Sequence, residues 1–165
     1  MPRALITGIA GQIGSYLAEL LLDKGYIVDG ILKSSTTNPY SNIKHIKDEL
    51  NLHYGDITDA SFLSRIDFEN IDEIYHLAAQ SHVAESFKNP EYTWNVNYNG
   101  TLLLVNAIYS KNQNAKFYFA GTSEMFGNAQ APQNEETPFE PCSPYAQAKA
   151  RAFLDLDTFI NDGNV

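Results

Sequence analysis

Hydrophobic and polar positions change their spacing several times along the chain, and each change marks an expected element. Apolar residues three or four positions apart predict helices that start after residue 11, near residue 90 and at residue 144. Because strand and helix patterns alternate through short connections, we expect an α/β fold with helices on both faces of a parallel sheet. Short apolar runs predict its strands at residues 4–7, 26–32, 52–54, 73–78 and 116–120.

Three glycines follow the first predicted strand at intervals of three residues: Gly8, Gly11 and Gly14. Such a turn lets backbone N–H groups approach a pyrophosphate, and the start of the next helix adds its positive dipole end. A tight turn without a ligand could use the same residues. The apolar strand before the turn and the amphipathic helix after it favour a dinucleotide site.

The helix after the glycine turn should pack through one apolar face. The residues expected on that face are Ile13, Leu17, Leu20 and Leu21. Gly25 is expected to end the helix in a left-handed cap.

The end of the second predicted strand indicates which dinucleotide to expect. An NAD site usually has a carboxylate there for the ribose hydroxyls, whereas this chain has Lys33 and then Ser34. This chemistry favours NADP, with NAD as the alternative. Asp29 is the competing acidic residue, but it lies within the strand and is expected at an exposed or edge position.

Tyr145 and Lys149 are four residues apart in a predicted helix that Pro144 opens after Ser143. That spacing places the phenol and the ammonium on one face, where the cation can favour phenolate. The pair therefore predicts a base for proton transfer near neutral pH. Such pairs also occur by chance on solvated helices, so their context matters.

Glu124 follows the fifth predicted strand, next to Thr122 and Ser123. A plain dehydrogenase needs only a hydroxyl beside its tyrosine, whereas a carboxylate adds a second acid or base for elimination. Glu124 could instead simply cap or solvate a loop. Its place at the carboxyl end of a central strand favours the catalytic interpretation, because ligands bind there in such sheets.

Composition narrows the function classes further. The chain has 165 residues, a length at which a single domain is expected. Its net charge of −9 argues against a surface that binds nucleic acid or an anionic membrane. Cys142 is the single cysteine, and no apolar stretch approaches the length of a membrane span. We therefore expect a cytoplasmic protein that acts on a small molecule, without a membrane partner.

His76 and His82 are the histidines nearest to the predicted site. A metal site or a general base could use either of them. Neither has a second ligand at a suitable spacing, so both are expected to be packing or loop residues. No metal is expected.

Longer motifs carry a resemblance to a known family. They are Thr122-Ser123-Glu124, Ala79-Gln80-Ser81-His82-Val83 and the run from Gly11-Gln12 to Ala18-Glu19, together with Ser143-Pro144-Tyr145. This set resembles the GDP-mannose 4,6-dehydratase family of extended short-chain dehydrogenases/reductases, over essentially the whole chain. The resemblance implies a Rossmann-like, doubly wound sheet.

The resemblance also implies a reaction. Tyr145, assisted by Lys149, would remove the proton of the C4 hydroxyl of GDP-mannose while NADP+ accepts the C4 hydride. Glu124 would remove the C5 proton and help expel the C6 hydroxyl as water, and Thr122 would hold the C4 oxygen. Return of the hydride to C6 would give GDP-4-keto-6-deoxymannose.

By the same resemblance, particular residues would bind the cofactor and the protein would be a homo-oligomer, a dimer or a tetramer. Asp56 and Ile57 would contact the adenine, and Ser81 would also face the sugar. The expected cofactor-binding residues are Gly8, Gly11, Gln12, Ile13, Gly14, Lys33, Ser34, Asp56, Ile57, Leu77, Ala79, Ser81, Tyr145 and Lys149.

The chain departs from the family pattern at three places. The family usually has Asp at the position of Ile13 and an Arg pair at Lys33-Ser34. It also continues well beyond the position of Val165, so residues 1–165 are expected to be an incomplete dinucleotide-binding domain without the substrate-binding domain. The fifth strand would then be an open edge, and the chain alone would be inactive.

Two other functions remain possible from the sequence. A dTDP- or UDP-sugar dehydratase or epimerase would share the sheet and the Tyr145–Lys149 pair, but epimerases lack the glutamate and dTDP-glucose dehydratases typically have Thr-Asp-Glu. A non-catalytic dinucleotide-binding fragment would need neither Thr122 nor Glu124.

Overall fold

The computed structural model describes residues 1–33 and 40–159, which fall into two compact units. Unit 1 contains Met1–Ala78 and Leu103–Ala120, and unit 2 contains Ala79–Leu102 and the chain from Gly121 onwards. Ser34 lies outside the described residues. Among the described helices, none combines the length and the apolar character that crossing a membrane would require.

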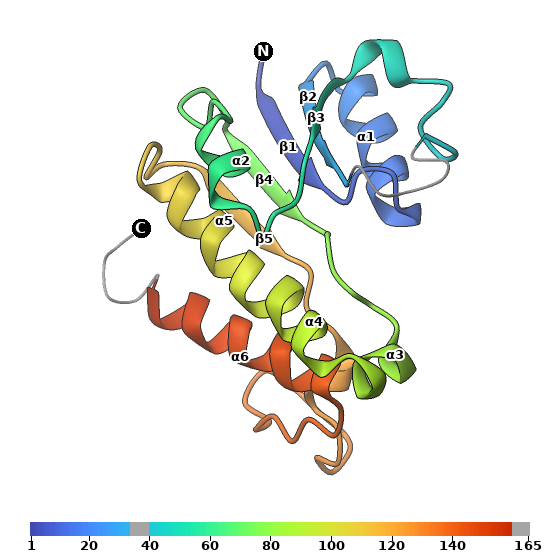
Figure 1. Ribbon diagram of the computed structural model, residues 1–165, viewed down its shortest axis with the longest axis vertical. Coiled ribbons are helices and arrows are strands. Elements are labelled where there is room, and N and C mark those ends of the chain that lie inside the picture. The colour runs from blue at the N-terminus through green and yellow to red at the C-terminus, as the bar shows by residue number, and fades with distance from the viewer. Residues whose placement is uncertain (34–39, 160–165) are drawn as a thin grey trace. The chain divides into compact units, whose positions relative to one another are not determined.

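Unit 1 is built on a five-stranded sheet in the order β3-β2-β1-β4-β5, in which every neighbouring pair is parallel (Figure 1). The order reverses at β1, which is the arrangement of a doubly wound fold. All five predicted strands are confirmed, although the fourth ends two residues earlier than expected. The strands are β1 (Arg3–Thr7), β2 (Ile27–Leu32), β3 (Asn51–Tyr54), β4 (Glu73–His76) and β5 (Lys116–Phe119).

The first helix packs against β1 and β2 through a face that matches the predicted one only in part: Leu21 is buried and Leu17 packs against the core, as expected. Its buried residues are Gly14, Ser15, Ala18 and Leu21, whereas Ile13 is 70% exposed and Leu20 is 51% exposed. The small residues allow the helix to approach the strands closely, so the long side chains beside them turn to solvent. Gly25 follows the helix with a φ of 78°, as predicted. The helices of this part are α1 (Gln12–Asp23), the 3₁₀ turn η1 (Lys47–Glu49) and α2 (Ala60–Ser64).

One long helix was predicted between residues 90 and 110, and the structure interrupts it with a π-helical turn. The turn η2 (Asn95–Asn99) joins α4 (Pro90–Trp94) to α5 (Gly100–Tyr109). Turns of this type are rare and frequently occur at functional sites. The polar side chains of this turn are therefore candidates for a role near a functional site.

Unit 2 is helical in its described part, and its elements pack around one long helix. The helix α6 (Pro144–Phe159) contacts α3 (Val83–Lys88), α4, η2 and the 3₁₀ turn η3 (Ser123–Met125). Its buried face contains four alanines, whose small side chains let neighbouring helices come close.

Candidate active site

The glycine turn of unit 1 leaves no room for side chains. Gly8 has a φ of 73°, and a Cβ on Gly14 would lie 2.4 Å from the carbonyl oxygen of Gly8. The N–H of Gly11 donates to that same carbonyl oxygen at 2.9 Å, which closes the turn. The prediction that the third glycine permits tight packing of the helix on the strand is confirmed.

The amino end of α1 begins directly after this turn, with Gly11 as its cap. The first N–H groups of any helix lack partners within the helix and carry partial positive charge. Gln12 and Ile13 are both exposed, so the backbone near them is accessible. This geometry suits a phosphate group, and no side chain of Gly11 blocks the approach.

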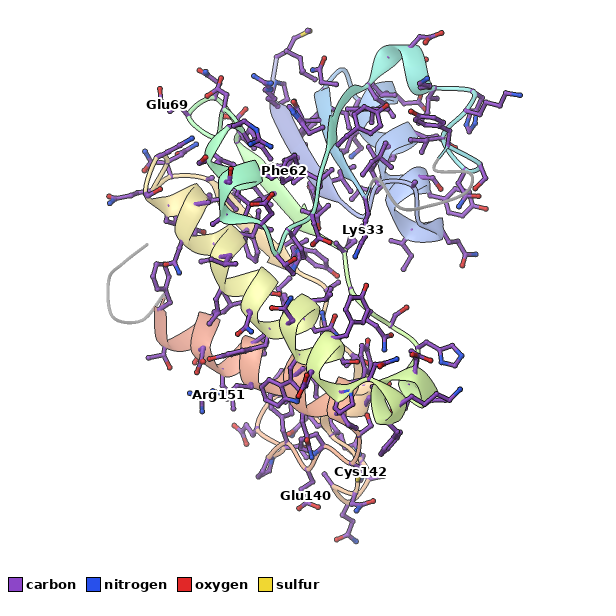
Figure 2. All side chains as sticks on the ribbon, in the orientation of Figure 1. Lys33, Phe62, Glu69, Glu140, Cys142 and Arg151 are labelled. Carbon is purple, nitrogen blue, oxygen red and sulfur yellow. The ribbon has the colours of Figure 1, made fainter. Side chains whose placement is uncertain are left out.

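Lys33 and Asp56 form an ion pair beyond the ends of β2 and β3, with 2.9 Å between Nζ and Oδ2; Figure 2 labels Lys33. Thr58 donates to Oδ1 of Asp56 from its backbone N–H at 3.0 Å and from its hydroxyl at 2.8 Å. Burial raises the pKa of Asp56, but the hydrogen bonds from Lys33 and Thr58 outweigh burial and hold the pKa below its ordinary value. Asp56 is therefore an oriented carboxylate, followed in the chain by the buried Ile57.

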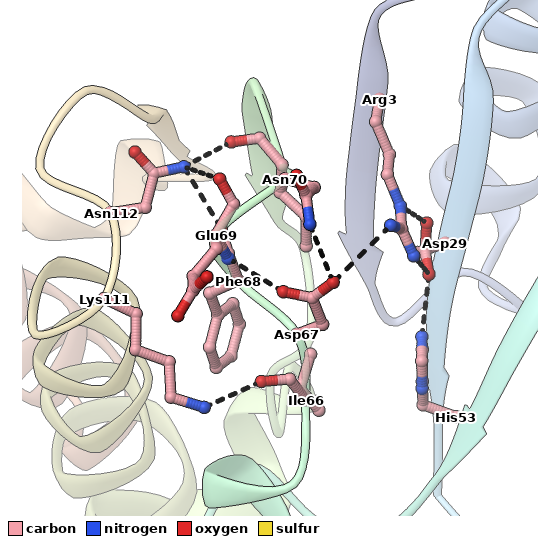
Figure 3. Close-up of polar contacts among 11 residues, drawn as sticks. Arg3, Asp29, His53, Ile66, Asp67, Phe68, Glu69, Asn70, Lys111 and Asn112 are labelled. Atoms are coloured by element: carbon pink, nitrogen blue, oxygen red, sulfur yellow. Dashed lines mark hydrogen bonds and ion pairs between the residues drawn. The ribbon is translucent and has the colours of Figure 1, made fainter.

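The expectation that Asp29 is at an exposed or edge position is wrong, because the residue is fully buried and β2 lies between β1 and β3. The guanidinium of Arg3 donates to both carboxylate oxygens, at 2.7 Å and 2.9 Å, and Nε2 of His53 lies 2.8 Å from Oδ1 (Figure 3). Burial raises the pKa of Asp29, but the hydrogen bonds from His53 and Arg3 outweigh it, and the pKa lies below its ordinary value. Asp29 is thus committed to the fold and does not offer a carboxylate to a ribose.

The end of β4 is tied to the end of β1. The N–H of Leu77 donates to the carbonyl of Thr7 at 3.2 Å, and the N–H of Ala78 donates to the Thr7 hydroxyl at 3.0 Å. His76 is buried and contacts the same hydroxyl, which confirms the packing role expected for it. The half-buried Leu77 therefore lies in a well-held stretch of backbone.

In unit 2, the loop that carries Ala79 and Ser81 is fastened by a residue that the sequence analysis missed. The side chain of Asn97 accepts from the backbone N–H of Gln80 at 2.8 Å and donates to its carbonyl at 2.9 Å. Asn97 lies in the π-helical turn and is buried. Asparagine recurs at every second position of Asn95–Asn99, and this is a sequence signal that could have identified the turn, because asparagine is unfavourable inside a helix.

The same loop receives a second contact from the helix before the π-helical turn. The side-chain amide of Gln80 donates to the hydroxyl of Thr93 at 3.1 Å, and the N–H of His82 donates to the side-chain oxygen of Gln80. Nδ1 of His82 accepts from the N–H of Glu85 at 3.2 Å and so caps α3, which confirms the loop role expected for His82. Ala79 is half-buried and Ser81 is exposed.

Thr122 and Glu124 lie at the start of η3. The hydroxyl of Thr122 accepts from the N–H of Glu124 at 3.3 Å, so Thr122 caps this short turn. The side chain of Glu124 is exposed, and its turn contacts α6. Glu124 is therefore a carboxylate that an incoming molecule can reach, on an element that packs against the helix of Tyr145.

Tyr145 and Lys149 lie on the buried face of α6, at 8% and 3% exposure. Ser143 caps this helix, because its hydroxyl accepts from the N–H of Ala146 at 3.1 Å, and Pro144 is the first helical residue, as predicted. Burial lowers the pKa of Lys149 to about 8. Four residues separate Lys149 from Tyr145, so the buried cation and the phenol lie on the same face of α6.

The predicted site residues accordingly divide between the two units. Unit 1 contains the residues expected to hold the dinucleotide's phosphates and adenosine, and unit 2 contains the residues expected to transfer protons. The first group is Gly8, Gly11, Gln12, Ile13, Gly14, Lys33, Asp56, Ile57 and Leu77, and the second is Ala79, Ser81, Thr122, Glu124, Tyr145 and Lys149.

Comparison with known sequences gives a consistent result. The profile of the family described as GDP-mannose 4,6 dehydratase matches residues 5–159. A GDP-mannose 4,6-dehydratase of Yersinia enterocolitica is 53% identical over 164 residues, which cover 93% of this chain and 44% of that protein. GDP-mannose 4,6 dehydratase 1 of Arabidopsis thaliana is 49% identical over 162 residues, which cover 90% of this chain and 45% of that protein. The chain therefore spans less than half the length of these relatives.

Solved structures with the same fold act on other nucleotide sugars. The UDP-Glc/GlcNAc 4-epimerase of Campylobacter jejuni has a TM-score of 0.88 at 25% identity, over 99% of this chain and 51% of that one. A dTDP-glucose 4,6-dehydratase of Streptomyces venezuelae, with NAD and TYD bound, has a TM-score of 0.83 at 30% identity, over 95% of this chain and 51% of that one. These structural similarities support the expected Rossmann-like fold. The sequence comparisons identify the family within that fold. Because the family profile matches nearly the whole chain and its relatives are about half identical to it, the chain belongs to the GDP-mannose 4,6-dehydratase family.

Proposed function

We propose that the whole protein converts GDP-mannose into GDP-4-keto-6-deoxymannose and water, with NADP as its cofactor. Residues 1–165 would form its dinucleotide-binding domain. The observation that carries this proposal is the buried Tyr145–Lys149 pair on a helix that contacts the turn of Glu124, in a chain of this family. When bound, the dinucleotide supplies a hydride acceptor for C4 of the sugar and afterwards a hydride donor for C6.

Tyr145 is proposed as the base that removes the proton of the C4 hydroxyl. Its phenolate is favoured by the ammonium of Lys149, which keeps most of its charge at neutral pH because its pKa is about 8. Thr122 holds the C4 oxygen, which needs a hydrogen-bond donor as it becomes a ketone. Oxidation at C4 then makes the C5–H acidic enough for a carboxylate to remove.

Glu124 is proposed as the group that removes the C5 proton and protonates the departing C6 hydroxyl. Its exposed carboxylate supports this role, because a buried and paired carboxylate would not reach a substrate. Glu124→Gln in the full-length protein should slow water loss by about 10² to 10⁴ while leaving C4 oxidation, measured by reduced-nicotinamide absorbance, close to wild type. Equal loss of both steps would remove this role from Glu124.

The residues of unit 1 fit a dinucleotide. Gly8, Gly11 and Gly14 form a cradle that side chains would fill, at the amino end of α1, and we propose that the pyrophosphate binds there. Asp56 would contact the adenine. Contacts along the rest of the cofactor are proposed for Gln12, Ile13, Ile57, Leu77, Ala79 and Ser81, with Ser81 also facing the sugar.

We propose NADP rather than NAD as the preferred dinucleotide. The burial of Asp29 supports this, because that carboxylate is occupied by Arg3 and His53 and cannot bind ribose hydroxyls. The cation that follows β2 is Lys33, held by Asp56 at 2.9 Å. Titration with NADP+ and NAD+ should give the lower dissociation constant for NADP+, and the reverse order would contradict the preference.

A non-catalytic dinucleotide-binding module is the alternative from another class. The burial of Lys149 argues against it, because a buried cation with a lowered pKa reduces stability, and dinucleotide binding alone does not require such a group.

The other alternative is a related dehydratase or epimerase that acts on another nucleotide sugar. It is tested by comparing GDP-mannose with UDP- and dTDP-glucose as substrates. We further propose a homo-oligomer, a dimer or a tetramer, to be measured by sedimentation.

A further inference from the structure

Thr7 and His76 meet at the carboxyl ends of β1 and β4 in unit 1. They are register partners on β1 and β4, and both side chains are buried. Oγ1 of Thr7 lies 2.7 Å from Nδ1 of His76. A hydrogen bond between a hydroxyl and an imidazole is thus placed directly before Gly8, where the glycine turn begins.

The bonds of the Thr7 hydroxyl indicate which way this proton points. A hydroxyl has one proton to donate and two lone pairs. The hydroxyl of Thr7 already accepts from the N–H of Ala78 at 3.0 Å, so its own proton has Nδ1 of His76 as an acceptor at 2.7 Å. When Nδ1 accepts this proton it carries none of its own, and the proton of a neutral ring is then on Nε2.

The neighbouring strand holds the imidazole ring from the side. Phe117 and Phe119 of β5 have ring centroids 5.9 Å and 6.0 Å from that of His76. The carbonyl of His76 accepts from the N–H of Ala120 at 3.2 Å. Ring and backbone are therefore both fixed, and the ring cannot turn away from Thr7 without disturbing β5.

The position of Ala78 decides how much room the glycine turn has. A Cβ on Gly8 would lie 3.0 Å from the nitrogen of Ala78 and 3.1 Å from its Cα. The backbone of the turn and the backbone after β4 are therefore already at close contact. A small shift of Ala78 would change the shape of the cradle proposed for the pyrophosphate.

We propose that His76 is a positioning residue of the dinucleotide site. Its neutral imidazole accepts the proton of the Thr7 hydroxyl and thereby orients the lone pair that holds the N–H of Ala78. Ala78 in turn fixes the backbone against which Gly8 packs. The proposal rests on the proposed dinucleotide function, since it assigns a role in shaping that site.

Two substitutions of His76 separate this role from mere filling of the core. His76→Asn offers a side-chain oxygen close to the position of Nδ1 and can still accept from Thr7, whereas His76→Leu fills similar space without an acceptor. The dissociation constant for NADP+, from fluorescence titration of the full chain, should stay within about twofold for His76→Asn and rise about tenfold for His76→Leu. Equal affinity of the two variants would overturn the proposal.

A second pair keeps the test decisive if His76→Leu fails to fold. Thr7→Ser keeps the hydroxyl and Thr7→Val removes it at nearly the same volume. Thr7→Ser should bind NADP+ as the wild type does, and Thr7→Val should bind about tenfold more weakly. Thermal unfolding of each variant shows whether it is folded before binding is measured.

Nitrogen-15 NMR of the wild-type chain gives a test that needs no dinucleotide. Nδ1 of His76 should have the shift of an unprotonated nitrogen, and the amide proton of Ala78 should exchange faster in His76→Leu than in His76→Asn. A protonated Nδ1, or equal exchange in the two variants, would overturn the inference. Wild-type protein that passes this test but binds no dinucleotide would instead refute the proposed function of unit 1.

Discussion

The two units treat their buried charges in opposite ways. In unit 1 the carboxylate of Asp29 is surrounded by Arg3 and His53, and its pKa lies below the ordinary value despite burial. In unit 2 burial dominates at Lys149 and lowers its pKa to about 8. A carboxylate whose pKa is lowered on folding stabilises the fold at neutral pH, whereas a cation whose pKa is lowered on folding reduces its stability. Unit 1 therefore gains stability from its buried charge, whereas unit 2 retains a buried charge that costs stability.

Replacing Lys149 should have the largest effect of the substitutions considered for the two units. Lys149→Met in the full-length protein should lower dehydration by about 10² to 10⁴, because Tyr145 loses the cation that favours its phenolate. The same change should raise the free energy of unfolding at pH 7 by up to about 3 kcal/mol, from the difference between the ordinary pKa of 10.5 and the value of about 8. Urea unfolding and product assays measure both effects.

The control for that experiment is Tyr145→Phe, which should lose similar activity without the gain in stability. The sign of the pH dependence gives a further check. A cation with a lowered pKa binds fewer protons in the folded protein, so wild-type stability should rise from about pH 8 to 10.5, and Lys149→Met should lack this rise. A Lys149→Met protein less stable than the wild type at pH 7 would contradict the interpretation of unit 2.

Replacing Asp29 is the corresponding test of unit 1. Asp29→Asn removes a charge that Arg3 and His53 share, and should cost about 3 to 5 kcal/mol in the free energy of unfolding. The matched control is Asp67→Asn, because that carboxylate is half exposed and lies 4.0 Å from Arg3. Since the pKa of Asp29 is lowered on folding, its contribution should be lost as pH falls below about 4 through the folded pKa. Equal stability of the two variants would show that unit 1 does not depend on this pairing.

Local sequence patterns were sufficient for the strands, the glycine turn and the start of α6. These features depend on neighbouring residues: apolar runs between turns, glycines at fixed intervals, and Pro144 directly after its capping serine. Two short helices, α2 and α3, were not predicted, since five or six residues are too few to display a helical period.

Features that depend on distant residues were missed or mistaken. Asp29 was expected at an exposed or edge position, because its partners Arg3 and His53 are 26 and 24 residues away in the chain. Asn97 and Gln80 are 17 residues apart, so their pairing was invisible as well. Ile13 was placed on the buried face of α1 because its apolar character gives no information on how closely Gly14 lets the helix approach. Within the site, the residue types could therefore be predicted from the sequence, but the distant residues that hold them in place could not.

Asn97 offers a second contrast with Asp29 of unit 1, because in unit 2 a neutral side-chain amide holds the backbone of Gln80. Asn97→Ala would leave the N–H and the carbonyl of Gln80 without their partner, and should cost about 1 to 3 kcal/mol in urea unfolding. Asn99→Ala is the matched control, since its side chain is exposed and makes a long contact of 3.4 Å. Similar losses of stability in the two variants would mean that the loop of Ala79 and Ser81 does not depend on the hydrogen bonds from Asn97.

The smallest expected effect concerns the cap of α6. Ser143→Ala removes the acceptor for the N–H of Ala146, and should cost about 1 kcal/mol. Ser143→Gly should cost only about a few tenths of a kcal/mol, because glycine is tolerated at helix caps and adds no bulk at this buried position. A loss in Ser143→Gly as large as in Ser143→Ala would show that the side chain packs and does not cap.

The central claim is that one protein oxidises C4, eliminates water and returns the same hydride to C6. The most direct test is to supply the full-length protein with NADP+ and GDP-mannose that carries deuterium at C4, and to locate the label in the product by NMR. The account predicts GDP-4-keto-6-deoxymannose with deuterium at C6 and no net reduction of the cofactor. Deuterium that stays at C4, or that leaves with reduced cofactor, would contradict it.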